Sequence, residues 1–169
     1  TETPQGLIAV VRKSAATAAD LLDAETPLVV ALDGVQDPGN VGTIIRSADA
    51  AGATGVILGR GTADLYNPKT VRATMGSLFH LPVVEGDLGE LLPQARQRGI
   101  RIVGASLEAR TSCYEADLTG PLWLVVGNEG SGISAELLPH LTESLIIPMR
   151  GRAESLNVAM ATTVLLFEA

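Results

Sequence analysis

The sequence predicts an α/β domain with a mostly parallel sheet and helices on both faces of that sheet. Short runs of Val, Leu and Ile recur along the 169 residues, and segments of helical length lie between them. The runs are apolar throughout rather than alternating, which is typical of strands that are covered on both faces. Because strands that alternate with helices form parallel sheets, both observations predict the same fold class.

The predicted strands are buried apolar runs, and the predicted helices are bounded by residues that start or stop a helix. The strands are residues 28–32, 55–58, 82–84, 100–105, 122–126 and 144–149. Glycine stops two helices, at residues 41–52 and 88–99, although Pro93 is expected to kink or shorten the second. Other helices are expected at 17–23, from Asn67-Pro68 to about Leu78, and from Ser155 or Asn157 to the end.

The composition excludes several classes of protein. Hydrophobic residues make up 46% of the chain and charged residues 18%, which fits one compact domain and not a disordered chain. No apolar run reaches the roughly 20 residues of a membrane span, and no signal peptide is visible. Cys113 is the only cysteine, so an internal disulfide is excluded. We therefore expect a soluble, cytoplasmic domain that covers residues 1–169.

The net charge and the ends of the chain indicate a part of a longer protein. The net charge of −7 is unusual for a protein that binds nucleic acid by itself. The first residue is Thr rather than Met, and the apolar pattern at the carboxyl end has no stop signal. We expect further chain outside these residues.

Three loops of unusual composition follow predicted strands, where open parallel sheets bind their ligands. The first loop, residues 33–42, contains Asn40 near the start of a helix that carries Arg46 among small and apolar residues. Asn40 is equally well explained as a helix N-cap. Arg46 is either a surface arginine or a fork for a phosphate or a carboxylate.

The second and third loops are residues 127–134 and 147–161. Glycines in the second loop let the backbone approach a ligand, and Glu129 is either a helix N-terminal charge or an active-site carboxylate. This pattern is not the dinucleotide fingerprint, which follows the first strand of a sheet. In the third loop, Ser155 and Asn157 either cap the last helix or hold a polar ligand.

Taken together and in this order, the three loops resemble the three signature motifs of the SpoU/TrmH family of RNA ribose 2′-O-methyltransferases, in the SPOUT superfamily. Motif 1 is matched by DPGNVGTIIRSADAAG (37–52), motif 2 by GNEGSGIS (127–134) and motif 3 by IPMRGRAESLNVAMATTVLLFEA (147–169). The resemblance covers residues 4–169. It implies a C-terminal deep trefoil knot, a rare feature that composition and periodicity do not predict.

The resemblance also implies the cofactor and the site residues. S-adenosyl-L-methionine is the expected cofactor, and no metal is expected. The residues expected to bind it are Gly127, Ile147, Met149 and Leu156, with Ser106 or Leu107 as a weaker candidate. The expected catalytic residues are Arg46, Asn40, Glu129, Ser155 and Asn157, in an active site that lies across the interface of a homodimer. Since a guanidinium is an implausible base, Arg46 is expected to bind the phosphate of the target nucleotide.

The expected activity is methyl transfer to a ribose 2′-hydroxyl of RNA, with 23S ribosomal RNA as the expected substrate. PQGLIAVV (4–11) resembles the start of the catalytic domain in members that carry an added N-terminal RNA-binding domain, and those members often act on large-subunit ribosomal RNA. Transfer RNA is the alternative substrate. Two remoter alternatives are a non-catalytic RNA-binding or ribosome-assembly module, disfavoured by the intact polar residues, and a nucleotide-binding oxidoreductase, disfavoured by the missing fingerprint.

Overall fold

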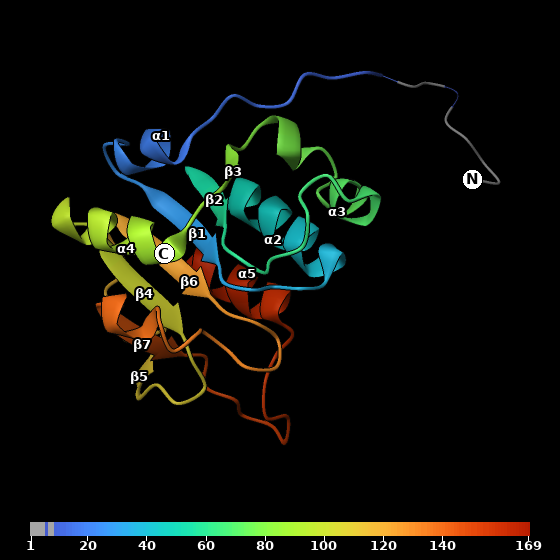
Figure 1. Cartoon of the computed structure of the whole chain (residues 1–169). Helices are drawn as coiled ribbons and strands as arrows, with labels where there is room; N and C mark the ends of the chain where they lie inside the picture. The colour runs from blue at the N-terminus through green and yellow to red at the C-terminus, as the bar shows by residue number, and fades with distance from the viewer. Residues whose placement is uncertain (1–5, 7–8) are drawn as a thin grey trace.

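The computed structural model describes residue 6 and residues 9–169, so half of the expected domain start at 4–11 lies outside the described residues. The described chain is built on a seven-stranded sheet in the order β3-β2-β1-β6-β4-β7-β5, and every strand pair in it is parallel (Figure 1). The strands are β1 (Leu28–Leu32), β2 (Gly55–Leu58), β3 (Val83–Glu85), β4 (Arg101–Ala105), β5 (Thr111–Ser112), β6 (Leu122–Val126) and β7 (Glu143–Ile146). The predicted fold class is confirmed, and the knot stays a prediction.

Helices cover both faces of this sheet (Figure 1). Residues of β1 alternate between the two faces: Val30 packs in the core with α2 (Pro38–Ala50) and α5 (Val158–Glu168), while Val29 packs in the core with α1 (Ala18–Leu22) and α4 (Leu88–Gln97). Val29 and Val30 are both fully buried, so the cores on the two faces of the sheet exclude solvent from β1. Burial on both faces explains why the strands are apolar throughout.

Helix α3 (Pro68–Ala73) packs beside α2. It is followed by the single 3₁₀ turn η1 (Ser77–Phe79), and a second such turn, η2 (Leu138–His140), precedes β7. At Gly42 of α2, an added Cβ would lie 2.5 Å from both the Ala73 Cβ and the Thr70 carbonyl oxygen. Glycine at this position therefore allows α2 and α3 to approach closely.

Two of the candidate helix caps, Asn40 and Ser155, do not cap their helices, whereas a third candidate, Asn157, does. Asp37, not Asn40, caps α2: its carboxylate accepts the Asn40 N–H at 2.9 Å, and Pro38 occupies the first turn, where no donor is needed. Asn157, not Ser155, caps α5 by accepting the Ala159 N–H at 2.9 Å. Both corrections leave the Asn40 side chain free of helix capping and place it close to Asn157.

Several predicted boundaries also differ. The predicted helix 67–78 ends at Ala73, because Met75 and Gly76 adopt positive φ angles of 50° and 100°. α4 continues through Pro93 and ends at Gln97. The predicted strand 144–149 ends at Ile146, just before Pro148, which lacks an N–H for a sheet. The short strand β5 is absent from the sequence prediction, because two residues carry no periodicity.

The order of the strands brings the ends of the three motifs together. β6 lies between β1 and β4, and β4 lies between β6 and β7. The carboxyl ends of β1, β6, β4 and β7 therefore lie along one edge of the sheet, from which motif 1 (after β1), motif 2 (after β6) and motif 3 (after β7) emerge. Among the residues described, no helix is long and apolar enough to cross a membrane.

Candidate active site

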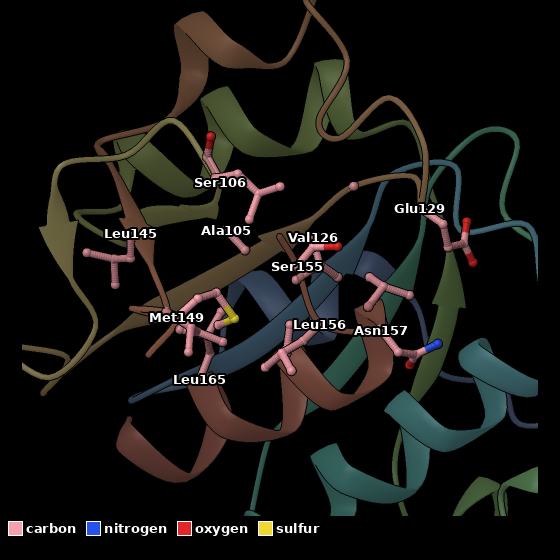
Figure 2. A pocket seen from close by; sticks show the side chains of 15 residues that line it. Ala105, Ser106, Val126, Glu129, Leu145, Met149, Ser155, Leu156, Asn157 and Leu165 are labelled. Carbon is pink, nitrogen blue, oxygen red and sulfur yellow. The ribbon is translucent and has the colours of Figure 1, made fainter. Parts of the chain in front are cut away.

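A cavity of about 360 Å³ opens at the carboxyl ends of β4, β6 and β7 (Figure 2). Glu129 and Asn157 lie at one end of this cavity, and Leu145 lies at the other. Leu145 and Leu165 are almost completely buried, so the base of the cavity is apolar. The lining residues come from all three strand ends and from α5: Ala105, Ser106, Leu107, Val126, Gly127, Glu129, Leu145, Ile147, Met149, Ser155, Leu156, Asn157, Val158, Ala161 and Leu165.

Gly127 forms the tightest part of the cavity wall. A Cβ added there would lie 2.1 Å from the Gly132 carbonyl carbon and 2.3 Å from the Ile133 nitrogen. The turn that approaches it is closed by reciprocal backbone hydrogen bonds between Asn128 and Gly132, each of 3.0 Å. The Asn128 side chain accepts the Gly130 N–H and donates to the Gly34 carbonyl, both at 2.8 Å. The turn is thus fixed on two sides, and only glycine fits at position 127.

The loop that connects β7 to α5, residues 147–156, forms another wall. Within the described part of the chain, no backbone N–H or C=O of this loop has a hydrogen-bond partner. Ile147, Met149 and Leu156 of the loop line the cavity with apolar side chains. Free backbone donors and acceptors beside apolar side chains suit a ligand that has a flat apolar face and a polar edge.

One hydrogen-bonded chain joins residues of the three motifs. The Asn157 Nδ2 donates to the Asn40 Oδ1 at 3.0 Å, and the Asn40 Nδ2 donates to the Glu129 Oε1 at 2.9 Å. Since the Asn157 Oδ1 caps α5, the orientation of both amides is fixed by their partners. These three predicted catalytic residues, far apart in the sequence, therefore act as one unit in the fold.

Glu129 is an ionised acceptor in this unit. Burial by itself would raise the pKa of Glu129, but hydrogen bonds from the Asn40 side chain and from backbone N–H groups, including those of Gln36 and Asp37, outweigh it and lower the pKa below the ordinary value. A carboxylate with a lowered pKa stays charged at neutral pH. Glu129 therefore ties the loop after β1 to the turn after β6 and contacts the Asn40 side chain.

The other two predicted catalytic residues make no such contacts. Arg46 is exposed on α2 and is not part of the cavity wall; no ion pair or side-chain hydrogen bond reaches it from the residues that the structure describes. Ser155 lines the cavity beside the chain of Asn40, Glu129 and Asn157, and its hydroxyl is likewise free within the described residues. Arg46 therefore presents an uncommitted guanidinium fork to whatever approaches α2.

All six predicted cofactor-binding residues line the cavity, namely Gly127, Ile147, Met149, Leu156, Leu107 and Ser106. Sequence reasoning missed the base of the cavity. Val158, Ala161 and Leu165 lie on one side of α5 at helical spacing, a pattern that the sequence contains but that also fits any buried helix face. Leu145 and Val126 were predicted only as strand residues.

The chain matches the SpoU rRNA Methylase family over residues 27–167. It is 42% identical to the 23S rRNA (guanosine(2553)-2′-O)-methyltransferase RlmP of Bacillus subtilis (strain 168), an alignment that covers 99% of this chain and 65% of that protein. It is 39% identical to the 23S rRNA (uridine(2479)-2′-O)-methyltransferase of Streptomyces viridochromogenes, over 99% of this chain and 61% of that protein. The chain thus spans slightly less than two thirds of the length of these relatives.

Solved structures give the same grouping. The AdoMet-bound rRNA methyltransferase from Sinorhizobium meliloti superposes with a TM-score of 0.84 at 42% identity, over 93% of this chain and 60% of that one. The A. aeolicus TrmH/SpoU tRNA modifying enzyme superposes with a TM-score of 0.76 at 32% identity, over 89% and 78%. With motif, fold and similarity in agreement over most of its length, the chain belongs to the SpoU rRNA methylase family.

Proposed function

We propose that this chain is the catalytic domain of an S-adenosyl-L-methionine-dependent RNA ribose 2′-O-methyltransferase that acts on 23S ribosomal RNA. The observation that carries the proposal is the position of the Asn40–Glu129–Asn157 unit at the end of a cavity built from motifs 2 and 3. The relatives at about 40% identity that act on 23S ribosomal RNA support this substrate over transfer RNA. We also propose that the chain works in the cytoplasm, within a longer protein whose N-terminal domain binds RNA.

The cavity fits the cofactor. Its volume of about 360 Å³ lies in the range of small-molecule sites. The adenine ring would pack on Ile147, Met149 and Leu156, with its polar edge bound by free backbone groups of the loop 147–156. Bound there, S-adenosyl-L-methionine supplies a methyl group on a sulfonium, which is an excellent leaving group. Leu145 and Leu165 keep water out of the base of the cavity.

The protein's own tasks are then to align the ribose and to help its proton leave. The ribose 2′-oxygen would gain the methyl group by cleavage of the S–CH3 bond of the cofactor, which would leave as S-adenosylhomocysteine, while the proton of the 2′-hydroxyl would pass to water. Asn40 is held in one orientation by Glu129 and Asn157, so it offers a fixed polar contact beside the cavity. Arg46 binds the phosphate of the target nucleotide through its guanidinium fork, which orients the hydroxyl.

The cofactor and the substrate are tested together. S-adenosyl-L-methionine or S-adenosylhomocysteine at 100 times its dissociation constant is expected to stabilise the chain by about 2.7 kcal/mol, which raises the melting temperature. NAD and EDTA serve as controls and are expected to leave it unchanged. Methyl transfer is then measured on 23S ribosomal RNA and on transfer RNA, and the methylated ribose is mapped. No thermal shift with either ligand, or transfer to RNA bases instead of ribose, would contradict the proposal.

The exposed side of α5 supports a homodimer. Met160 and Phe167 are 49% and 65% exposed and lie on one side of this apolar helix, next to α2. An exposed apolar helix face is typical of a subunit interface. A second copy on α5 would also bring Arg46 of one subunit close to the other subunit, where the cavity lacks a cation.

A double substitution tests the dimer. Met160→Glu with Phe167→Glu is expected to convert a dimer into a monomer, because two charges would be buried at an apolar interface. Light scattering at micromolar concentration gives the mass. The control is Leu138→Glu in η2, a residue that is also about half exposed and is expected to leave the dimer intact. A wild-type chain that is monomeric at this concentration would show that the interface is absent.

A further inference from the structure

A surface beside the polar unit contains Arg46 and, next to it, exposed side chains that have no role in the reaction described so far. It is formed by α3, η1 and the turn between them, together with the adjoining exposed residue of α2. Its exposed side chains are Arg72, Met75, Phe79 and Arg46, and we refer to them as the α3 surface. Met75 and Phe79 are 73% and 65% exposed, so neither contributes to the core.

The charges of the α3 surface are unneutralised in an acidic protein. Three arginines elsewhere pair with carboxylates, in Arg60–Asp87, Arg98–Asp23 and Arg101–Glu143. Among the described residues, the arginines without any ion-pair or hydrogen-bond partner are Arg12, Arg46, Arg72, Arg110, Arg150 and Arg152. Since acidic residues outnumber basic ones by 19 to 12, free cations beside a site favour an anionic partner.

The backbone of the turn presents apolar side chains to solvent. Met75 has a φ of 50°, which a residue with a side chain rarely adopts, and Gly76 follows it with a φ of 100°. Such a conformation on an exposed turn is typical of a functional contact. At the other end of α3, Tyr66 lies just before the N-cap Asn67, with the Lys13 Nζ 4.1 Å from the centre of its ring. Aromatic side chains beside cations are the groups that bind unpaired nucleotides.

The α3 surface is fixed to the polar unit and continuous with it. The Lys69 Nζ of α3 pairs with Asp37 at 2.7 Å, and the Asp37 N–H donates to Glu129. At the far end, His80 lies 3.5 Å from Asp49 of α2, one turn beyond Arg46. A chain bound at the cavity therefore reaches the α3 surface directly along α2.

We propose that the α3 surface binds the unpaired nucleotides that flank the target nucleotide in RNA, an inference that rests on the proposed function. Phe79 and Met75 stack on their bases, and Arg72 contacts their phosphates. Stacking of this kind tolerates any base, so the surface selects unpaired RNA and leaves the choice of sequence to other parts of the protein.

The test compares two labelled RNAs, a hairpin with an unpaired loop and a fully paired duplex of the same length. Their affinities are measured by fluorescence anisotropy at fixed salt. Phe79→Ala is expected to weaken hairpin binding about 5- to 150-fold and to leave duplex binding nearly unchanged. Arg72→Ala is expected to lower the slope of the logarithm of affinity against that of salt by about 0.7. The matched controls are Tyr114→Ala, another exposed ring, and Arg98→Ala, on the opposite face of the sheet.

Each result of this experiment either supports or overturns RNA binding by the α3 surface. Loss of hairpin affinity in Phe79→Ala and Arg72→Ala but not in the controls, at unchanged melting temperature and cofactor affinity, supports it. Unchanged hairpin affinity overturns it, and so does a shift from dimer to monomer in these variants, since the face would then belong to a second copy of the chain. If the wild type methylates no RNA, the proposed function fails, while the hairpin affinities still decide the role of the α3 surface.

Discussion

Replacing Arg46 by alanine is expected to remove nearly all methyl transfer while leaving the fold and the cofactor affinity intact. The side chain is exposed and has no partner among the described residues, so its loss costs no internal contact. Loss of a charge-assisted contact to a phosphate is worth about 1.5–3 kcal/mol, or about 10- to 150-fold in rate. The rate, the cofactor dissociation constant and the melting temperature are measured on the same variant.

Two further variants sharpen this experiment. Arg46→Lys is also expected to be impaired, because lysine keeps the charge but lacks the planar two-pronged donor. Arg98→Ala is the control, since Arg98 lies at the end of α4 on the other face of the sheet. Near-normal turnover in Arg46→Ala would show that another group orients the target.

The second large effect is expected from Gly127→Ala. The added methyl group would lie 2.1 Å from backbone of the turn 128–132, so the turn must move away from the cavity. Overpacking of this kind costs about 1–3 kcal/mol of unfolding free energy. A displacement of about 1 Å in a site is worth about 100-fold in rate. Thermal unfolding measures the first effect and the methyl-transfer rate the second, while calorimetry with S-adenosyl-L-methionine gives the cofactor affinity.

Gly130→Ala in the same turn is the matched control. A Cβ at Gly130 lies 3.5 Å from the Asn128 Oδ1, which is ordinary contact, and its backbone is not in the left-handed region. This variant is expected to bind the cofactor nearly as the wild type does. If Gly127→Ala and Gly130→Ala behave alike, the close approach at Gly127 has no functional importance.

The sequence was sufficient for the central strands β1 and β6, because burial on both faces leaves a strong signal. The boundaries of β1 and β6 were predicted correctly, and both strands lie between other strands with helices above and below. The caps were not predictable in the same way, because Asp37 and Asn40, or Ser155 and Asn157, are equally good capping residues at nearly the same position. Only the backbone conformation decides between them.

The identity of the site residues could be predicted from the sequence, but their contacts could not. These residues were named from motif resemblance, but their hydrogen bonds depend on the order of the strands. Asn40 and Glu129 follow β1 and β6, which are adjacent in the sheet although far apart in the sequence. The left-handed Met75 was also beyond prediction, since nothing in the residue itself favours a positive φ. Spatial proximity, rather than residue type, was the missing information.

The place of β6 in the sheet has a consequence for how the chain folds. β6 hydrogen-bonds to β1 on one side and to β4 on the other, so these two strands cannot join until residues 122–126 have entered between them. Contacts between segments so distant in sequence raise the contact order, and high contact order slows folding. Before that step, β1 and β4 expose unpaired edges, which are the usual points of association between nascent chains. Because β6 ends at Val126 and Gly127 follows it, the ligand cavity cannot be complete before this insertion, and ligand binding would draw the chain toward the completed sheet.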